Sequence, residues 1–191
     1  MKLNRYLILD RDGVINLDSP DYIKSPEAFQ PMAHSLSAIA LLTKLGYGIL
    51  IATNQSGLAR GYYSHDILEQ IHEKMHALIQ AAGGKILDVF FCPHGPADLC
   101  LCRKPKIGLY HAIQQKYPEI ILPHTYSVGD SLRDLQAAEK AGCLPVLVKT
   151  GNGEKTHQTI QNDTALSAFL SVPVFEHLGS FAEFLSSHER K

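Results

Sequence analysis

The segment over residues 6–16, YLILDRDGVIN, places two carboxylates directly after a short apolar run. Asp10 and Asp12 stand one residue apart, and neither burial nor like-charge repulsion favours such a pair for stability alone. Carboxylates at a strand end can hold a cation or perform nucleophilic and acid–base chemistry. Gly13 follows the pair and permits a sharp backbone turn. The segment therefore predicts a functional site at the end of the first strand. The alternative is a solvated strand end without function.

Polar side chains also follow three further apolar runs of the sequence. They are Thr53, Asn54, Gln55 and Ser56 after the second run, Arg103 and Lys104 after the third, and Asp130, Ser131 and Asp134 after the fourth. In α/β folds with parallel sheets, ligands bind at the carboxyl ends of the strands. These side chains are therefore expected to converge on one edge of a sheet.

This set of side chains fits phosphoryl transfer. Asp10 can attack phosphorus and form an aspartyl-phosphate, while a magnesium ion held by Asp10 and Asp130 would offset the repulsion between carboxylate and phosphate. Lys104 adds a fixed positive charge, and Thr53 and nearby backbone amides can donate to the transferring oxygens. Asp12 is placed to pass a proton to the leaving alkoxide.

Short apolar runs that alternate with helical periodicity define the expected elements. The predicted strands are residues 7–9, 48–53, 86–91, 125–129, 144–148 and 172–175. The predicted helices are residues 34–45, 64–82, 108–117, 131–141 and 178–185. The segment GNGEKTHQTIQND, residues 151–163, is predicted to be a mobile loop. Strand–helix–strand repetition predicts an α/β fold: a single Rossmann-like domain over residues 1–191, with a parallel sheet, helices on both faces and no large cap domain.

Composition and charge restrict the classes of partner. The chain has 191 residues and a formal net charge of -1, without a run of lysine or arginine, which argues against nucleic-acid binding. No apolar stretch is long enough to span a membrane, and carboxylates near the N-terminus interrupt any signal peptide. We expect a cytoplasmic monomer that acts on a small molecule.

The segment CPHGPADLCLC, residues 92–102, contains a candidate metal set. Its members are Cys92, His94, Cys100 and Cys102. Three thiolates and one imidazole complete a tetrahedron with no open position, which predicts structural zinc. A disulfide is the alternative, but Cys100 and Cys102 are too close in sequence to pair easily. Zinc would fold this loop and hold Arg103 and Lys104 in place.

Four motifs of the sequence resemble those of the haloacid dehalogenase superfamily, in the same order. They are LDRDGV, ATNQSG, CRKPK and VGDSLRD, and they span residues 7–150. The resemblance implies that Asp10 is the nucleophile, Asp12 the general acid and base, Thr53 and Lys104 phosphoryl stabilisers, and Asp130 a magnesium ligand. In this superfamily the backbone carbonyl at the position of Asp12 also binds the metal.

The Cys/His loop and the segment TNQSGLARG resemble a cap-less branch of histidinol-phosphate and heptose-bisphosphate phosphatases. This resemblance implies magnesium-dependent removal of the 7-phosphate of a D-glycero-D-manno-heptose 1,7-bisphosphate, on the way to nucleotide-activated heptose for lipopolysaccharide or another surface glycan. A second phosphate would need a cation at the pocket rim, either Arg60 or Arg103. The predicted substrate-binding residues are Asp18, Tyr22, Asn54, Gln55, Ser56, Arg60, Arg103 and Ser131.

Two other functions remain open from the sequence. A histidinol-phosphate phosphatase would bind an amine and would need acid at the rim, for which Asp18, Asp21 and Glu27 are candidates. The short stretch over residues 95–99 favours that branch, and Ser131 stands where many relatives are expected to carry lysine. A non-catalytic zinc-loop module would lack at least one of the four main catalytic residues, and none is missing.

Overall fold

The computed structural model describes residues 5–188, which form six strands and six α-helices. The strands are β1 (Arg5–Leu9), β2 (Tyr47–Asn54), β3 (Asp88–Cys92), β4 (Tyr126–Gly129), β5 (Leu144–Val148) and β6 (Val174–Phe175). The α-helices are α1 (Ser35–Lys44), α2 (His65–Ala81), α3 (Gly108–Lys116), α4 (Leu132–Lys140), α5 (Gly153–Asn162) and α6 (Leu178–His188). Two 3₁₀ helices, η1 (Leu122–His124) and η2 (Thr164–Ser171), complete the described elements. Within residues 5–188, none of the helices combines the length and apolar character needed to cross a membrane.

All six strands belong to one parallel sheet with the order β3-β2-β1-β4-β5-β6. β1 lies inside the sheet, where Leu9 is in register with Ile51 of β2 and Val128 of β4. The chain passes from β1 to β2 on one side and later reaches β4 on the other. Such a reversal opens a crevice at the carboxyl end of the central strand. Asp10 follows β1 directly and therefore lies at this crevice.

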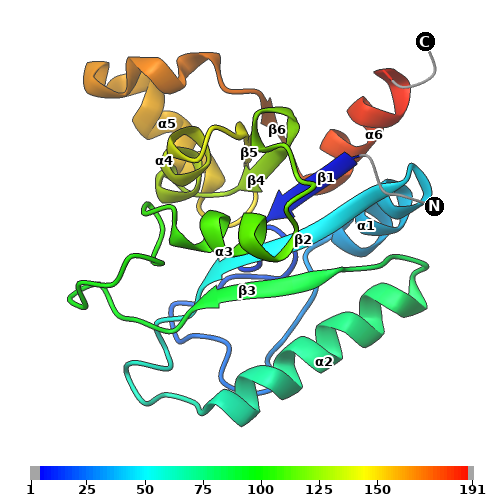
Figure 1. Cartoon of the computed structure of the whole chain (residues 1–191), viewed down its shortest axis with the longest axis vertical. Coiled ribbons are helices and arrows are strands. Elements are labelled where there is room, and N and C mark those ends of the chain that lie inside the picture. The colour runs from blue at the N-terminus through cyan, green and yellow to red at the C-terminus, as the bar shows by residue number, and fades with distance from the viewer. Residues whose placement is uncertain (1–4, 189–191) are drawn as a thin grey trace.

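Helices cover both faces of the sheet (Figure 1), and alternate residues of β1 pack against the helices of opposite faces. Leu7 and Leu9 join a core with α1, α2 and α6, whereas Tyr6 and Ile8 join a second core with α3 and α4. Successive side chains of a strand point to opposite faces, so an apolar run without polar alternation needs cover on both. The prediction of a parallel sheet with helices on both faces is confirmed.

The apolar stripe, the N-cap and the terminal glycine of helix α2 can all be recognised in its sequence. Its buried stripe consists of Leu68, Ile71, Met75 and Ile79. The Ser64 hydroxyl caps the helix by accepting from the Ile67 amide at 3.3 Å. Beyond the last turn, Gly83 takes a φ of 85°, a conformation that suits glycine and stops the helix.

The prediction of a mobile loop over residues 151–163 is wrong, because most of this segment forms α5. Only a sparse set of its side chains is buried, Thr156 and Ile160 among them, so the sequence shows no clear apolar stripe. Ile160 packs with Leu147 of β5 and Phe169 of η2. Tertiary contacts with a later segment stabilise this helix more than its own pattern does.

Candidate active site

Asp10 and Lys104 form the centre of a buried charge cluster at the end of β1. Lys104 Nζ lies 3.1 Å from Asp10 Oδ1 and 2.7 Å from Asp134 Oδ1, and it donates to the Ala52 carbonyl at 2.7 Å. Asp10 Oδ1 also accepts from the Arg11 backbone amide at 2.7 Å, whereas Asp10 Oδ2 accepts no hydrogen bond from residues 5–188. One carboxylate oxygen of Asp10 is therefore fixed, and the other is available to a reacting atom.

The pKa values of the three carboxylates in this cluster are shifted in different directions. Burial raises the pKa of Asp10 to about 6, although the Lys104 ammonium opposes the change. Burial, with the charges of Asp134 and Asp10, raises the pKa of Asp130 to about 8. Burial also acts against ionised Asp134, but Lys104 outweighs it and holds the Asp134 pKa below its usual value. Asp10 and Asp130 therefore gain most from a further cation.

Asp10, Asp130 and Asp134 can hold that cation. Each offers one carboxylate oxygen, and these oxygens lie within 4.8 Å of one another. Carboxylate oxygen is the donor type that magnesium prefers, with water and phosphate completing its octahedron. The backbone next to the cluster is adapted to it: Gly13 has a φ of 80°, and a Cβ at this position would overlap the Asp130 carboxylate. The donor set fits the predicted magnesium site and adds Asp134 to it.

Asp12 lies beside Asp10 in a dense set of hydrogen-bond donors. The buried Arg11 guanidinium donates to both oxygens of the Asp12 carboxylate, with Nη2 at 2.9 Å from Oδ1 and 3.1 Å from Oδ2. Asn16 and Gln55 each donate to Asp12 at 2.9 Å. Burial disfavours the Asp12 charge, but these donors, Arg11 above all, hold the Asp12 pKa below its usual value. Arg11 also contacts His72, whose pKa burial lowers to about 3, so the ring is neutral and accepts.

Gln55 connects Asp12 to Thr53. Its amide nitrogen donates at 2.9 Å both to Asp12 Oδ2 and to Thr53 Oγ1. The Tyr63 hydroxyl donates to the Gln55 carbonyl oxygen at 2.8 Å and so fixes the orientation of the amide. Because Thr53 Oγ1 already accepts from Gln55, its own hydroxyl proton is free for an oxygen in the cavity.

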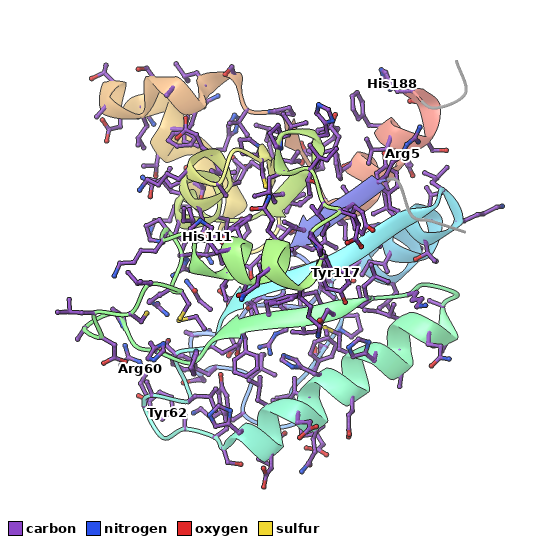
Figure 2. The ribbon with its side chains drawn as sticks, viewed as in Figure 1. Arg5, Arg60, Tyr62, His111, Tyr117 and His188 are labelled. Carbon is purple, nitrogen blue, oxygen red and sulfur yellow. The ribbon has the colours of Figure 1, made fainter. Side chains whose placement is uncertain are left out.

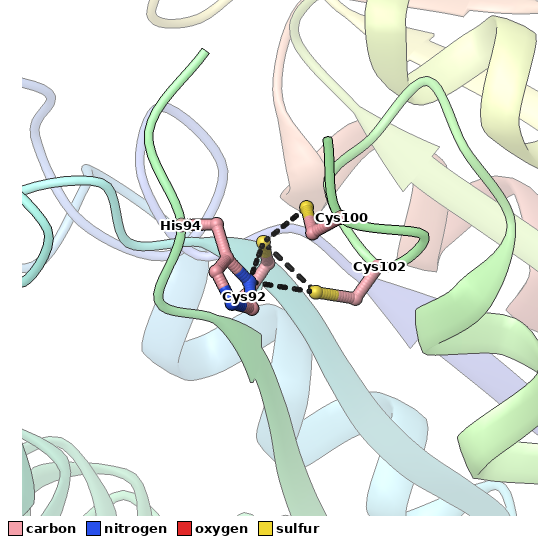
Figure 3. Close-up of side chains that lie close together, drawn as sticks. All are labelled: Cys92, His94, Cys100 and Cys102. Carbon is pink, nitrogen blue, oxygen red and sulfur yellow. Dashed lines mark hydrogen bonds between the residues drawn. The ribbon is translucent and has the colours of Figure 1, made fainter. Parts of the chain in front are cut away.

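The zinc candidates lie together at the end of β3, which holds Cys92, and in the following loop that leads to Lys104 (Figure 3). Cys92 Sγ lies 3.1 Å from Cys102 Sγ and 3.8 Å from Cys100 Sγ, and His94 Nδ1 lies 3.3 Å from Cys102 Sγ. All four ligand atoms fall within 4.8 Å of one another, a spacing that a tetrahedral zinc ion can bridge. The predicted set is therefore assembled, and the donor chemistry fits zinc.

Lys104 is fixed from a second side by Asn54. The Asn54 side chain donates to the Lys104 carbonyl at 3.1 Å and accepts from the Lys104 amide at 3.0 Å. Asn54 thus binds the protein backbone with both ends of its amide, although the sequence predicts a substrate contact. Ser131 is likewise engaged: it is the N-cap of α4, and both its amide and its hydroxyl donate to Asp134 Oδ2.

A cavity of about 280 Å³ opens above the cluster. Among its lining residues are the predicted Asp10, Asp12, Thr53, Asn54, Gln55, Ser56, Asp18, Tyr22, Arg60, Arg103 and Asp130. Lys104 and Ser131 lie behind this surface rather than on it. Arg60 and Tyr62 extend from the loop before α2, on the side of the molecule away from Arg5 and His188 (Figure 2). The Arg60 guanidinium lies 6.0 Å from the centre of the Tyr22 ring.

Several residues around the site were not predicted. They are Arg11, Asn16, Tyr63, Arg133 and Asn152, to which Asp134 is added as a possible metal ligand. Arg11 and Asn16 stand inside the first motif, so their place next to Asp12 was a usable signal. Asn152 gives no such signal, because it follows β5 in a segment without a recognised motif.

The fold and the site together define a class of protein, the HAD-like hydrolases. In agreement, residues 101–171 match the family model described as HAD-hydrolase-like. This match covers the Lys104 and Asp130 regions, and the superfamily predicted from the four motifs is confirmed.

Comparison with named proteins shows to which family of HAD-like hydrolases the chain is similar. A D-glycero-beta-D-manno-heptose-1,7-bisphosphate 7-phosphatase from Bordetella bronchiseptica is 51% identical over 152 residues, which cover 80% of this chain and 84% of the relative. An enzyme of the same name from Pseudomonas putida is 46% identical over 181 residues, which cover 95% of this chain and 99% of the relative. A crystal structure of D,D-heptose 1,7-bisphosphate phosphatase from B. bronchiseptica, complexed with magnesium and phosphate, superimposes with a TM-score of 0.89 at 46% identity, over 96% of this chain and 99% of that chain. The chain belongs to this family of heptose-bisphosphate phosphatases within the HAD-like hydrolases.

Proposed function

We propose that this protein is a magnesium-dependent phosphatase that removes the 7-phosphate of D-glycero-β-D-manno-heptose 1,7-bisphosphate. The observation that carries the proposal is the Asp10–Lys104–Asp134 cluster, which opens into a cavity lined by four arginines. The relatives named above act on this sugar, and one of them binds magnesium and phosphate. The product would serve the synthesis of nucleotide-activated heptose.

In the first proposed step, Asp10 Oδ2 attacks the phosphorus atom, and the bond from phosphorus to the sugar oxygen breaks. The leaving oxygen takes a proton from Asp12. A water molecule then attacks the phosphorus of the aspartyl-phosphate, Asp12 takes a proton from this water, and the bond from phosphorus to Asp10 breaks. Lys104 and the Thr53 hydroxyl stabilise the charge on the phosphoryl oxygens. Magnesium, held by Asp10, Asp130 and Asp134 with the Asp12 carbonyl, would neutralise part of that charge.

Asp12 must carry a proton when the leaving oxygen departs. In the structure its pKa lies below the usual value because of Arg11, Asn16 and Gln55, which outweigh its burial. A phosphate dianion in the cavity raises the pKa of a neighbouring carboxylate, because like charges favour the neutral form. We infer that substrate binding itself prepares Asp12 as the acid.

The rim of the cavity supports a bisphosphate rather than an amine substrate. Arg60 and Arg103 line it, and the Arg60 guanidinium lies within cation–π range of the Tyr22 ring, a contact that uses none of the N–H donors by which it could bind a phosphate. Of the acidic residues that an amine would need, only Asp18 lines the cavity, and it already accepts from Asn152. We therefore assign the distal phosphate to Arg60, with Arg103 as the alternative.

Phosphate release tests the substrate and Arg60 together. The panel contains both anomers of the heptose bisphosphate, fructose 1,6-bisphosphate, histidinol phosphate and p-nitrophenyl phosphate. A charge-assisted arginine–phosphate contact contributes about 1.5–3 kcal/mol, so Arg60→Ala should lower kcat/KM for the heptose bisphosphate by about tenfold to a hundredfold. The small monophosphate should be spared, since the reacting centre is untouched.

Lys24→Ala is the matched control for Arg60→Ala. Lys24 belongs to the same rim, where its ammonium lies 5.2 Å from the centre of the Tyr62 ring, but it does not line the cavity. If Arg60→Ala lowers kcat/KM equally for the bisphosphate and the small monophosphate, Arg60 has a structural role rather than a role in substrate binding. No loss on either would move the distal phosphate to Arg103, and turnover of histidinol phosphate above the heptose would replace the proposed substrate.

The wider setting of the enzyme is part of the same proposal. We propose one phosphatase domain over residues 1–191, with zinc in the loop over 92–102, acting as a cytoplasmic monomer without nucleic acid. A single sheet that continues to β6 supports one domain, and the clustered thiols support a reducing compartment.

A further inference from the structure

The segment that follows β5, residues 150–156, donates hydrogen bonds to Asp130 and to the neighbouring Gly13. Thr150 Oγ1 donates to the Gly13 carbonyl at 2.6 Å, and Thr156 Oγ1 donates to the Asp130 carbonyl at 2.9 Å. Between them, the backbone amide of Asn152 donates to Asp130 Oδ2 at 2.7 Å. The mechanism above uses none of the three donors, Thr150, Asn152 and Thr156, and the sequence predicted a mobile loop over residues 151–163.

The side chain of Asn152 is directed at two carboxylates instead of its own helix. Asn152 is the N-cap of α5, a position where asparagine usually accepts from an amide of the first turn, yet here it makes no such bond. Its Nδ2 donates to Asp130 Oδ2 at 3.3 Å and to Asp18 Oδ2 at 3.1 Å. One amide group therefore connects the buried carboxylate to the mouth of the cavity.

These contacts leave the two oxygens of Asp130 in different states. Asp130 Oδ2 accepts twice from Asn152, whereas Oδ1 accepts no hydrogen bond from residues 5–188. The rotation of the carboxylate is thereby fixed, and Oδ1 would be the oxygen available to a cation held together with Asp10 and Asp134. Groups behind a metal ligand commonly set its orientation and affect metal affinity by 10–100-fold.

We propose that Asn152 is a positioning residue for magnesium, which acts by orienting Asp130 and by joining it to Asp18 at the cavity mouth. The inference rests on the proposed function insofar as Asp130 holds the metal. Asn152→Ala removes both side-chain hydrogen bonds and keeps the backbone amide. Alanine fits the φ of -87° and ψ of 0° at this position, so the fold is retained.

Magnesium titrated calorimetrically into protein dialysed free of magnesium tests the proposal. Asn152→Ala should bind magnesium about tenfold more weakly than wild type, at the lower end of the range for such groups, because the backbone contact remains. Asn162→Ala is the control: it makes the same substitution at the other end of α5, where the side chain donates to the Gln158 carbonyl of its own helix and, among residues 5–188, to no carboxylate. The Tm without magnesium should match wild type in both variants, and excess magnesium should restore the kcat of Asn152→Ala.

Each other outcome has a distinct meaning. Equal magnesium affinity in wild type and Asn152→Ala would overturn the inference while leaving the proposed function intact. If Asn152→Ala instead lowers the Tm and causes a loss of activity that excess magnesium does not restore, Asn152 has a structural role. That result would also overturn the inference. Failure of wild type to bind magnesium would instead refute the proposed metal site itself.

Discussion

Replacing Asp10 by asparagine should separate activity from stability. Asn has nearly the same shape but cannot attack phosphorus, so kcat should fall by at least about a thousandfold. The same change removes a buried negative charge that Asp134 and Asp12 repel. The fold without metal should therefore become more stable while the enzyme loses its function.

The pKa of Asp10 gives the size of this stabilisation. It lies at about 6, against an ordinary value of 3.8, because burial disfavours the charge more than Lys104 favours it. That displacement corresponds to about 3 kcal/mol of stability that an ionised Asp10 removes from the fold. Because the folded pKa lies above the unfolded one, this cost is absent below about pH 4, grows as pH rises from 4 to 6, and is complete above pH 6. Asn carries no charge, so Asp10→Asn should gain up to about 3 kcal/mol above pH 6 and nothing at pH 4.

Thermal unfolding without magnesium, followed from pH 4 to 8, measures this difference. Asp66→Asn is the control, because it removes an exposed carboxylate from the first turn of α2. The Tm of Asp10→Asn should lie several degrees above that of wild type at pH 8, and the two Tm values should be equal at pH 4. A variant less stable than wild type at pH 8 would refute the reasoning on burial, and activity within tenfold of wild type would refute Asp10 as nucleophile.

Two further results are expected. Gently purified protein should contain about one zinc per chain by elemental analysis, and Cys100→Ser should lower this content and speed hydrogen exchange over residues 92–105. Absence of zinc from the wild type would contradict the assignment. Magnesium should bind more weakly as pH falls, because protons compete for Asp130 and Asp10, whose pKa values are about 8 and 6. The dissociation constant measured by calorimetry should rise about 50- to 100-fold from pH 8 to 6, and a constant independent of pH would contradict the burial of these carboxylates.

The sheet and the main site could be predicted because the two depend on the same feature of the sequence. Apolar runs buried on both faces mark the parallel strands, and the residue after each run lies at the functional edge. Asp10, Thr53 and Asp130 were placed in this way, and the structure brings them to one cavity. The four zinc candidates were predicted from residue type and spacing alone, since few other arrangements satisfy three thiols and an imidazole within eleven residues.

Other features depend on partners that the sequence does not reveal. Asn54 and Ser131 are polar residues next to the site, but the Asn54 amide is engaged by the Lys104 backbone and the Ser131 hydroxyl by Asp134. Arg11 is an arginine between two aspartates, which is typical of a solvated turn, yet it is 1% exposed. Only the three-dimensional arrangement shows which neighbour each polar group satisfies.

The charge cluster described above also bears on the order in which ligands arrive. With all groups ionised, Asp10, Asp130 and Asp134 supply three negative charges and Lys104 one positive charge, leaving a formal charge of about −2. A phosphate dianion that approached this surface alone would meet repulsion at short range and in a low dielectric. A divalent cation brings the balance to zero and turns the same surface into one that accepts phosphate. From this charge balance we expect magnesium to bind before the sugar phosphate, and inorganic phosphate to leave before the metal does.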